Sequence, residues 1–213
     1  MIDSIGFDLD GTLWDYASRY QEFFTEAVKE LPYVHKPTLE EIFAVTGLNA
    51  IDYVNALFPE LANSPLELRL SIFHYAEKLG SDTILKEGGR LYDGLEDMLK
   101  ILSKRYALFI ASNCEPDYLE NFLTFYGFHS YFADWTCHDL SKGSRSKGEN
   151  IKALCERHGY TRTVFVGDAQ SDADAASEAS VPFIWASYGY GSVPSAKHRI
   201  NSPIELVSLV EKL

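Results

Sequence analysis

The chain has 213 residues with a formal net charge of −12, and 46% of its residues are apolar. This composition excludes global disorder, because a chain of this length can bury a core of its own. The acidic surface repels nucleic acid backbones and anionic membranes, so we expect neither as a partner.

Cysteine usage and the first residues bear on the cellular compartment. The cysteines are only three, Cys114, Cys137 and Cys155, without CxxC spacing, and such an odd and sparse count is typical of a reducing compartment rather than of a disulfide framework. Charged residues within the first ten positions do not fit a signal peptide. The apolar runs are too short to cross a bilayer. We therefore expect a cytoplasmic protein.

Short apolar runs recur along the chain, with helical segments between them. Four runs have the composition of buried parallel strands, and a fifth is a weaker candidate. In chain order they are residues 2–7, 107–111, 131–135 (the weaker one), 163–166 and 182–186. Apolar residues at helical spacing occupy 95–102, 119–126 and 151–155. This alternation predicts an α/β fold with a Rossmann-like, doubly wound parallel sheet.

The stretch 16–88 interrupts this alternation and carries only helical signals. Thr38 and Glu41 form a capping-box pair, and the Ser64-Pro65 pair predicts a helix start, with Ser64 as N-cap and Gly80 ending the helix near Leu79. We predict an all-helical cap over 16–88, inserted after the first strand, and a core of 1–15 and 89–213. Its hinges are expected near residues 14–16 and 87–90.

The first chemical motif follows the first strand. Asp8 and Asp10 stand two residues apart at the end of that strand, and Gly11 allows a turn there. Ligands of open α/β sheets bind beyond the carboxyl ends of the strands. Two carboxylates so close repel each other unless a cation or a proton lies between them. The alternative is a solvated Asp-Gly turn, which fits a hairpin better than a strand end.

A second acidic strand end follows residues 163–166. Asp168 comes directly after that strand and its glycine, and Asp172 lies four residues on. The alternative is that Asp168 simply caps a helix. Together with Asp8 and Asp10, however, these carboxylates predict an oxygen-rich site of the kind that Mg²⁺ prefers.

Two further motifs offer groups for an anion. Ser112 and Asn113 follow the strand 107–111 and could donate to phosphate oxygens, or merely cap the helix before Pro116. Lys147 stands in a polar loop before a helix starting near Glu149. A lysine there opposes the helix dipole unless it holds an anion, although a plain surface lysine is the alternative.

These motifs, in this order, resemble the haloacid dehalogenase superfamily of phosphohydrolases, and the resemblance covers nearly the whole chain. The run Asp8-Leu9-Asp10-Gly11-Thr12 matches the family's first motif, and Ser112, Lys147 and the Gly167-Asp168…Asp172 run match the other three. The sequence looks most similar to the phosphoglycolate-phosphatase-like branch. The resemblance implies a central first strand and an all-helical cap.

The resemblance also implies roles for these residues. Asp8 is expected to attack phosphorus, and Asp10 to act as general acid and then base. Mg²⁺ is expected on Asp8, Asp10 (through its main-chain carbonyl), Asp168 and Asp172, the last through water or a second shell. Ser112, Asn113 and Lys147 are expected to bind the phosphoryl oxygens.

The sequence departs from the family pattern at two places. Many relatives have a proline after the lysine of the third motif, whereas Gly148 follows Lys147 here, and Lys142 nearby is an alternative phosphate ligand. Asp93 stands where relatives often have proline, which concerns the hinge more than the chemistry.

Several functions remain open at this point. A sugar-phosphate mutase with a similar cap would return the phosphoryl group to its substrate. A carbon–halogen hydrolase is less favoured, since it needs neither Asp10 as acid nor a metal. A phosphonate hydrolase would need a cap lysine, and nothing marks Lys29 or Lys36 for that role. A non-catalytic phosphometabolite-binding protein is the remaining alternative. The expected partner is a small phosphorylated metabolite, and the sequence predicts neither its identity nor the oligomeric state.

Overall fold

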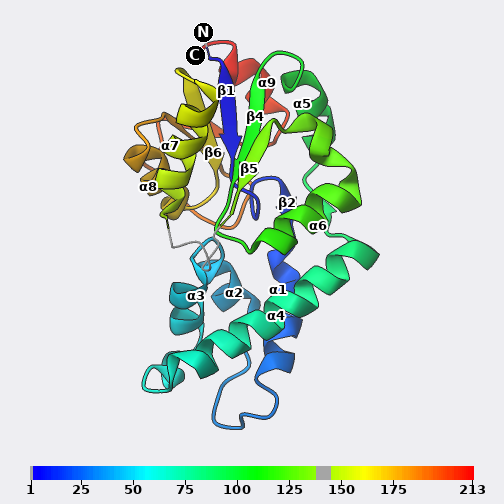
Figure 1. The fold of residues 1–213 in the computed structure, drawn as a ribbon, viewed down its shortest axis with the longest axis vertical. Helices are drawn as coiled ribbons and strands as arrows, with labels where there is room; N and C mark the ends of the chain where they lie inside the picture. Colours follow the sequence, from blue (N-terminus) through cyan, green and yellow to red (C-terminus); the bar gives the residue numbers. More distant parts are fainter. Residues whose placement is uncertain (1, 138–144) are drawn as a thin grey trace.

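The computed structural model describes residues 2–137 and 145–213, and a six-stranded parallel sheet forms its centre (Figure 1). The strand order is β5-β4-β1-β6-β7-β8, so β1 lies between β4 and β6. The strands are β1 (Ser4–Phe7), β4 (Ala107–Ala111), β5 (Asp134–Thr136), β6 (Thr163–Gly167), β7 (Phe183–Ala186) and β8 (His198–Ile200). The predicted α/β sheet with a central first strand is confirmed.

The central strand is buried along its whole length, and a glycine in it makes room for the neighbouring strands' side chains. A Cβ atom added at Gly6 would lie 2.5 Å from the ring of Phe109 and 2.8 Å from that of Phe165. These two fully buried rings come from β4 and β6, on either side of β1. The glycine therefore lets aromatic rings cover the middle of the sheet.

Helices cover both faces of the sheet, with α7 and α8 on one side and α5, α6 and α9 on the other (Figure 1). They are α5 (Leu95–Leu102), α6 (Pro116–Tyr126), α7 (Lys147–His158), α8 (Gln170–Glu178) and α9 (Glu205–Val210). The weaker strand candidate is confirmed only at its C-terminal end. A 3-10 helix, η2 (Phe128–Tyr131), covers its start, and β5 begins at Asp134.

The remaining helices gather beyond the carboxyl ends of the central strands, away from the two termini (Figure 1). They are α1 (Ala17–Ala27), α2 (Leu39–Val45), α3 (Ala50–Leu57), the 3-10 helix η1 (Pro59–Leu61) and α4 (Leu66–Glu87). A two-stranded antiparallel pair, β2 (Trp14–Asp15) with β3 (Arg90–Leu91), lies where the chain leaves and re-enters the core. We call α1–α4 the cap.

Two expectations for the cap helices are corrected, and one is confirmed. Helix α4 continues past Gly80 to Glu87, and Pro65 rather than Ser64 occupies its N-cap position, without a side-chain cap. The predicted capping box at the start of α2 is present: Thr38 Oγ1 accepts from the Glu41 backbone N–H, and Glu41 Oε2 accepts from that of Thr38.

Packing explains why α4 tolerates its internal glycine. The Tyr16 hydroxyl donates to the Gly80 carbonyl at 2.9 Å, and a Cβ at this position would lie 2.8 Å from the Tyr20 hydroxyl. Local propensity would favour a helix end at glycine, but the close approach of α1 requires a residue without a side chain.

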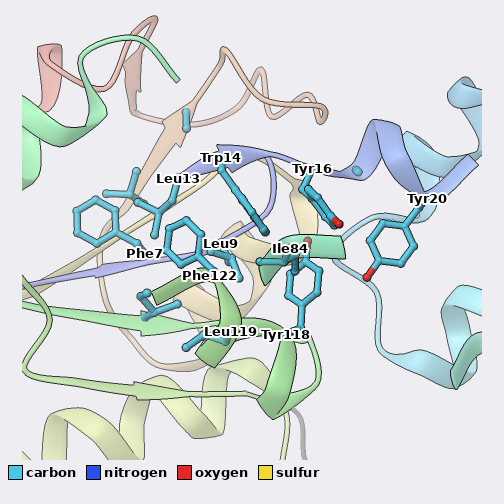
Figure 2. Close-up of a cluster of buried hydrophobic side chains, with 14 of the residues drawn as sticks. Phe7, Leu9, Leu13, Trp14, Tyr16, Tyr20, Ile84, Tyr118, Leu119 and Phe122 are labelled. Carbon is cyan, nitrogen blue, oxygen red and sulfur yellow. The ribbon is translucent and has the colours of Figure 1, made fainter. Parts of the chain in front are cut away.

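An aromatic cluster joins the cap to the core (Figure 2). The rings of Trp14 and Tyr16 stack with centroids 4.6 Å apart, and both rings meet Tyr118 of α6 edge-on. Tyr20 of α1 lies 6.2 Å from Tyr118, measured between ring centroids. The cluster therefore fixes two hydroxyl-bearing side chains, Tyr118 and Tyr20, at the boundary of the two parts.

None of the helices in the described ranges is long and apolar enough to cross a membrane.

Candidate active site

Asp8 lies at the carboxyl end of β1, where it forms a buried ion pair with Lys147. Lys147 Nζ donates to Asp8 Oδ1 at 2.8 Å and to Asp172 Oδ1 at 2.7 Å, and all three side chains are buried. Asp8 continues the strand register, since its backbone N–H donates to the Val166 carbonyl at 2.9 Å. Burial of these charges is tolerated because they are paired.

Lys147 is the first residue of α7, whose start is fixed by a capping box. Ser146 Oγ accepts from the Glu149 backbone N–H at 3.0 Å, and Glu149 Oε2 accepts from that of Ser146 at 2.8 Å. A cation at this end opposes the helix dipole, and the two carboxylates offset that cost. The predicted Lys147 therefore lies at the site, whereas its alternative Lys142 lies outside the described residues.

Gly148 follows this lysine, where the family that the sequence resembles often has proline, and it lies close to α8. A Cβ at Gly148 would lie 2.4 Å from the Glu178 carboxylate, which also accepts from Ser146 Oγ at 2.8 Å. Glycine at this position therefore leaves room for the contact between the start of α7 and Glu178 of α8.

Asp172 and Asp168 complete a cluster of carboxylates around Asp8. Asp172 Oδ2 accepts from the backbone N–H groups of Asp168 and Ala169, each at 3.1 Å, in the first turn of α8. One oxygen each of Asp8, Asp168 and Asp172 lies within 4.8 Å of the others. Three buried carboxylates at this spacing are a donor set that suits a hard cation such as Mg²⁺.

Asp168 is held from the other side by the loop after β7. Its Oδ2 atom accepts from the backbone N–H of Tyr190 at 2.7 Å and of Gly191 at 3.0 Å. A Cβ at Gly189 would lie 2.3 Å from the Gly11 carbonyl, so this loop passes against the first motif. The sequence analysis missed the loop. The run Gly189-Tyr190-Gly191 after the strand 182–186 was the available signal.

Asp10 has surroundings of its own, outside the three-carboxylate cluster. Its Oδ1 atom accepts from the Tyr118 hydroxyl at 2.6 Å and from Trp14 Nε1 at 3.0 Å. Gly11, where the sequence predicted a turn, takes a φ of 79°, in the left-handed region. The sequence analysis did not identify Tyr118 or Trp14, because both belong to the aromatic cluster rather than to a motif.

Burial changes the protonation of these groups. It raises the pKa of Asp8 to about 6, with the charge of Asp172 adding to the effect. It also raises the pKa of Asp10 to about 7, against the hydrogen bond from Tyr118, and it raises the pKa of Asp168 well above its usual range. A carboxyl group with a pKa near 7 suits general acid and base chemistry near neutral pH.

Ser112 and Asn113 lie at the end of β4, beside the same site. Ser112 is buried, and its Oγ accepts weakly from the Cys114 backbone N–H at 3.4 Å. Asn113 Nδ2 donates to the carbonyl of Gly47 at 2.7 Å, so its amide group is engaged with the cap. The cap loop at Thr46–Gly47 therefore reaches the core between α2 and α3.

A small cavity lies between the core and the cap, with a volume of about 40 Å³, room for a few water molecules. We call it the cap cavity. Its residues include Asp8, Asp10 and Ser112 of the core and Tyr20, Tyr53 and Glu77 of the cap. Asp10 therefore lines the same cavity as Asp8 and the cap residues.

Glu77 of α4 is the functional candidate that sequence reasoning missed in the cap. Burial raises its pKa to about 8, against a lowering by the nearby Tyr20 hydroxyl. Its position could have revealed it: Glu77 lies four residues after Phe73 and three before Gly80, both buried. A glutamate on the buried face of an amphipathic helix is unusual.

A family model described as "Haloacid dehalogenase-like hydrolase" matches residues 5–186 of this chain. The chain belongs to the haloacid dehalogenase-like hydrolases. Within this family, it is 28% identical over 198 residues to a phosphoglycolate phosphatase of Agrobacterium fabrum, covering 88% of this chain and 82% of that protein. It is 26% identical over 196 residues to one of Photobacterium profundum, with 89% and 85% covered.

Solved structures share the fold over the whole length of this haloacid dehalogenase-like chain. A predicted phosphatase from Clostridium acetobutylicum superposes with a TM-score of 0.83, at 21% identity and with 100% of both chains covered. A predicted phosphoglycolate phosphatase from Haemophilus somnus gives 0.84, at 20% identity and with 98% of both chains covered. These likenesses concern the fold, and the resemblance inferred from the motifs is confirmed.

Proposed function

We propose that this hydrolase is a magnesium-dependent phosphatase that cleaves a small phosphate monoester through a phosphoryl-aspartate on Asp8. The observation that carries the proposal is that two carboxyl groups only two positions apart in the sequence have different surroundings. Asp8 lies in a cluster with Lys147, Asp168 and Asp172, whereas Asp10 is held by Tyr118 and Trp14 on the wall of the cap cavity. The family membership and the phosphatase relatives support the same reaction.

The carboxylate cluster supports magnesium as the cofactor. Asp8 and Asp168 would hold the ion, with the main-chain carbonyl of Asp10, and Asp172 would support it through water or a second shell. When bound, Mg²⁺ supplies positive charge that offsets the repulsion between Asp8 and an incoming phosphate. Lys147, already paired with Asp8, adds to that positive charge.

Asp8 acts as the nucleophile and Asp10 as the proton carrier. One Asp8 oxygen attacks phosphorus in line, and the bond to the ester oxygen breaks. Asp10 gives its proton to that oxygen, which leaves as an alcohol. Asp10 then takes a proton from water as the water attacks the phosphoryl-aspartate, which releases phosphate and restores both carboxyl groups. The raised pKa of Asp10, about 7, supports both roles.

Ser112, Asn113 and Lys147 are proposed to bind the phosphoryl oxygens. Ser112 lines the cavity together with Asp8 and Asp10, which supports this role. Asn113 lies beside it but donates to Gly47, so contact with a substrate would exchange that bond or use its backbone N–H. The cap over residues 16–88 is proposed to exclude water and to select the substrate. A cytoplasmic location fits a small phosphorylated metabolite as substrate.

The first test is turnover of p-nitrophenyl phosphate with Mg²⁺ and with a chelator. We expect turnover only with Mg²⁺, and its loss in Asp8→Asn, which removes the nucleophile while keeping the size of the side chain. Ordinary turnover by a clean, folded Asp8→Asn sample would contradict the covalent mechanism. A hexose phosphate added in parallel separates the alternative, because a mutase would form an isomer rather than free phosphate.

A further inference from the structure

One carboxylate oxygen in the cap cavity is buried and has no hydrogen-bond partner. Oε2 of Glu77 is fully covered, and it meets the geometry of a hydrogen bond with none of the described residues. The same holds for the hydroxyl of Tyr20, although it lies close enough to Glu77 to lower the pKa of that group. A buried polar oxygen left unpaired is costly, so two of them in one cavity point to a missing ligand.

The cavity is lined by acidic groups and, among the described residues, has no cation of its own, so a cation that entered would favour the ionised form of Glu77. Among the described residues, its lining includes the carboxylates of Asp8, Asp10 and Glu77 but no lysine, arginine or histidine. Lys147 does not line it, because its ammonium group lies between Asp8 and Asp172. A substrate that brought a second anion would place that anion beside Glu77 with no compensating charge.

The rest of the lining is largely aromatic. Tyr20, Tyr53, Phe73 and Tyr118 contribute rings to the cavity wall. Aromatic faces attract cations and contribute most where water is excluded. The small volume suits a primary ammonium group on a short carbon chain.

We propose that Glu77 recognises a primary ammonium group on the leaving group, so that the substrate is the phosphate monoester of a small amino alcohol. This inference rests on the phosphatase function proposed above and specifies its substrate class. An ammonium group has three donors, which can meet Glu77 Oε2 and the Tyr20 hydroxyl oxygen together. Glu77 is a specificity-determining residue in this account, while the phosphoryl group is transferred on the core side.

The test compares three esters that share a two-carbon chain and differ at its end. They are 2-aminoethyl phosphate, with an ammonium group; 2-hydroxyethyl phosphate, with a hydroxyl group; and 2-phosphoglycolate, with a carboxylate. We expect kcat/KM to fall in that order, with about a tenfold or greater difference between the first and the last. A preference for 2-phosphoglycolate would overturn the inference, since the cavity would then favour a carboxylate, to which neutral Glu77 can donate, over an ammonium group.

A pair of variants on one helix assigns the preference to a residue. Glu77→Gln should raise KM for 2-aminoethyl phosphate about tenfold, with kcat much less affected, and leave KM for 2-hydroxyethyl phosphate nearly unchanged. Glu87→Gln is the matched control, because Glu87 is exposed on α4 and pairs only with Arg19 in the described structure. An equal change of KM for both esters in Glu77→Gln would overturn the assignment.

The outcomes separate this inference from the function on which it rests. The comparison of the three esters uses the wild-type protein, so it remains decisive if Glu77→Gln does not fold. Absence of magnesium-dependent turnover of p-nitrophenyl phosphate would refute the phosphatase proposal itself. Turnover of that ester together with equal kcat/KM for the three two-carbon esters would leave the phosphatase proposal standing and overturn the ammonium site alone.

Discussion

Two acidic regions adjoin the cap cavity, one in the core and one in the cap, and their carboxyl groups are held in different ways. On the core side, Asp8 and Asp172 share Lys147, and Asp168 accepts two backbone N–H groups. On the cap side, Glu77 Oε2 is buried and forms no hydrogen bond with any residue that the structure describes. The core carboxylates are therefore fixed by the protein itself, whereas we propose that the cap carboxylate is paired by a group of the substrate.

This difference separates chemistry from recognition. Phosphoryl transfer is faster when the catalytic groups are held in place before the substrate binds. A group that recognises a ligand is more selective when no other residue pairs with it, because a ligand without the matching group leaves this buried polar group without a hydrogen bond. We therefore expect changes on the core side to affect folding and chemistry together, and changes on the cap side to affect substrate choice.

The largest effect on stability is expected from the lysine shared by the core carboxylates. Lys147→Met removes a buried cation and leaves Asp8 and Asp172 uncompensated, which typically costs about 3–5 kcal/mol of unfolding free energy. Lys152→Met is the control, since Lys152 is exposed on the same helix. Urea unfolding without metal measures the free energy of unfolding of both variants. A loss as small in Lys147→Met as in the control would mean that the ion pairs contribute little.

A smaller effect on stability, a gain instead of a loss, is expected from replacing Glu77 in the cap. Burial raises the pKa of Glu77 in the folded protein to about 8, above about 4.3 in the unfolded chain. The folded state therefore binds more protons between these two values, and stability falls as the pH rises through that window. The glutamine of Glu77→Gln cannot ionise. We therefore expect the free energy of unfolding of this variant to be higher than that of the wild type by about 1 kcal/mol or more near pH 8, and by much less near pH 5.

Thermal unfolding at several pH values, without metal, measures this difference. A gain of 1 kcal/mol corresponds to a rise in Tm of about 2–4 °C for a chain of this size. Glu87→Gln again provides the control, because its exposed carboxylate has no burial to overcome. If the difference in Tm between Glu77→Gln and the wild type stayed constant across the pH range, the raised pKa of Glu77 would be wrong. The cap carboxyl group would then not differ from the core carboxylates in this respect.

The parts of the site that the sequence could predict are those in which one short segment carries both the strand and the functional group. Asp8 and Asp168 each follow a buried strand directly, and parallel strands bring their carboxyl ends together. Lys147 was less certain from its loop alone, and the capping box of Ser146 with Glu149 fixes its place at the start of α7.

The residues that the sequence did not predict act through contacts between distant segments. Tyr118 reaches Asp10 over a separation of 108 positions, and the backbone of Tyr190 reaches Asp168 over 22. The end of α4 was mispredicted for the same reason. Gly80 ends a helix by local propensity, but the contacts of Tyr16 and Tyr20 make a glycine necessary inside one.

The central claim is that Asp8 is the nucleophile and Asp10 the proton carrier, and Asp10→Ala tests it most directly. Hydrolysis of an alkyl phosphate should slow by about a hundredfold or more, because an alkoxide needs a proton to leave. A dinitrophenyl ester needs none, so stopped-flow absorbance should show one rapid burst of dinitrophenolate per active site, followed by slow turnover as the phosphoryl-aspartate on Asp8 accumulates. An equally slowed burst for this ester, or a fast burst followed by fast turnover, would contradict the account.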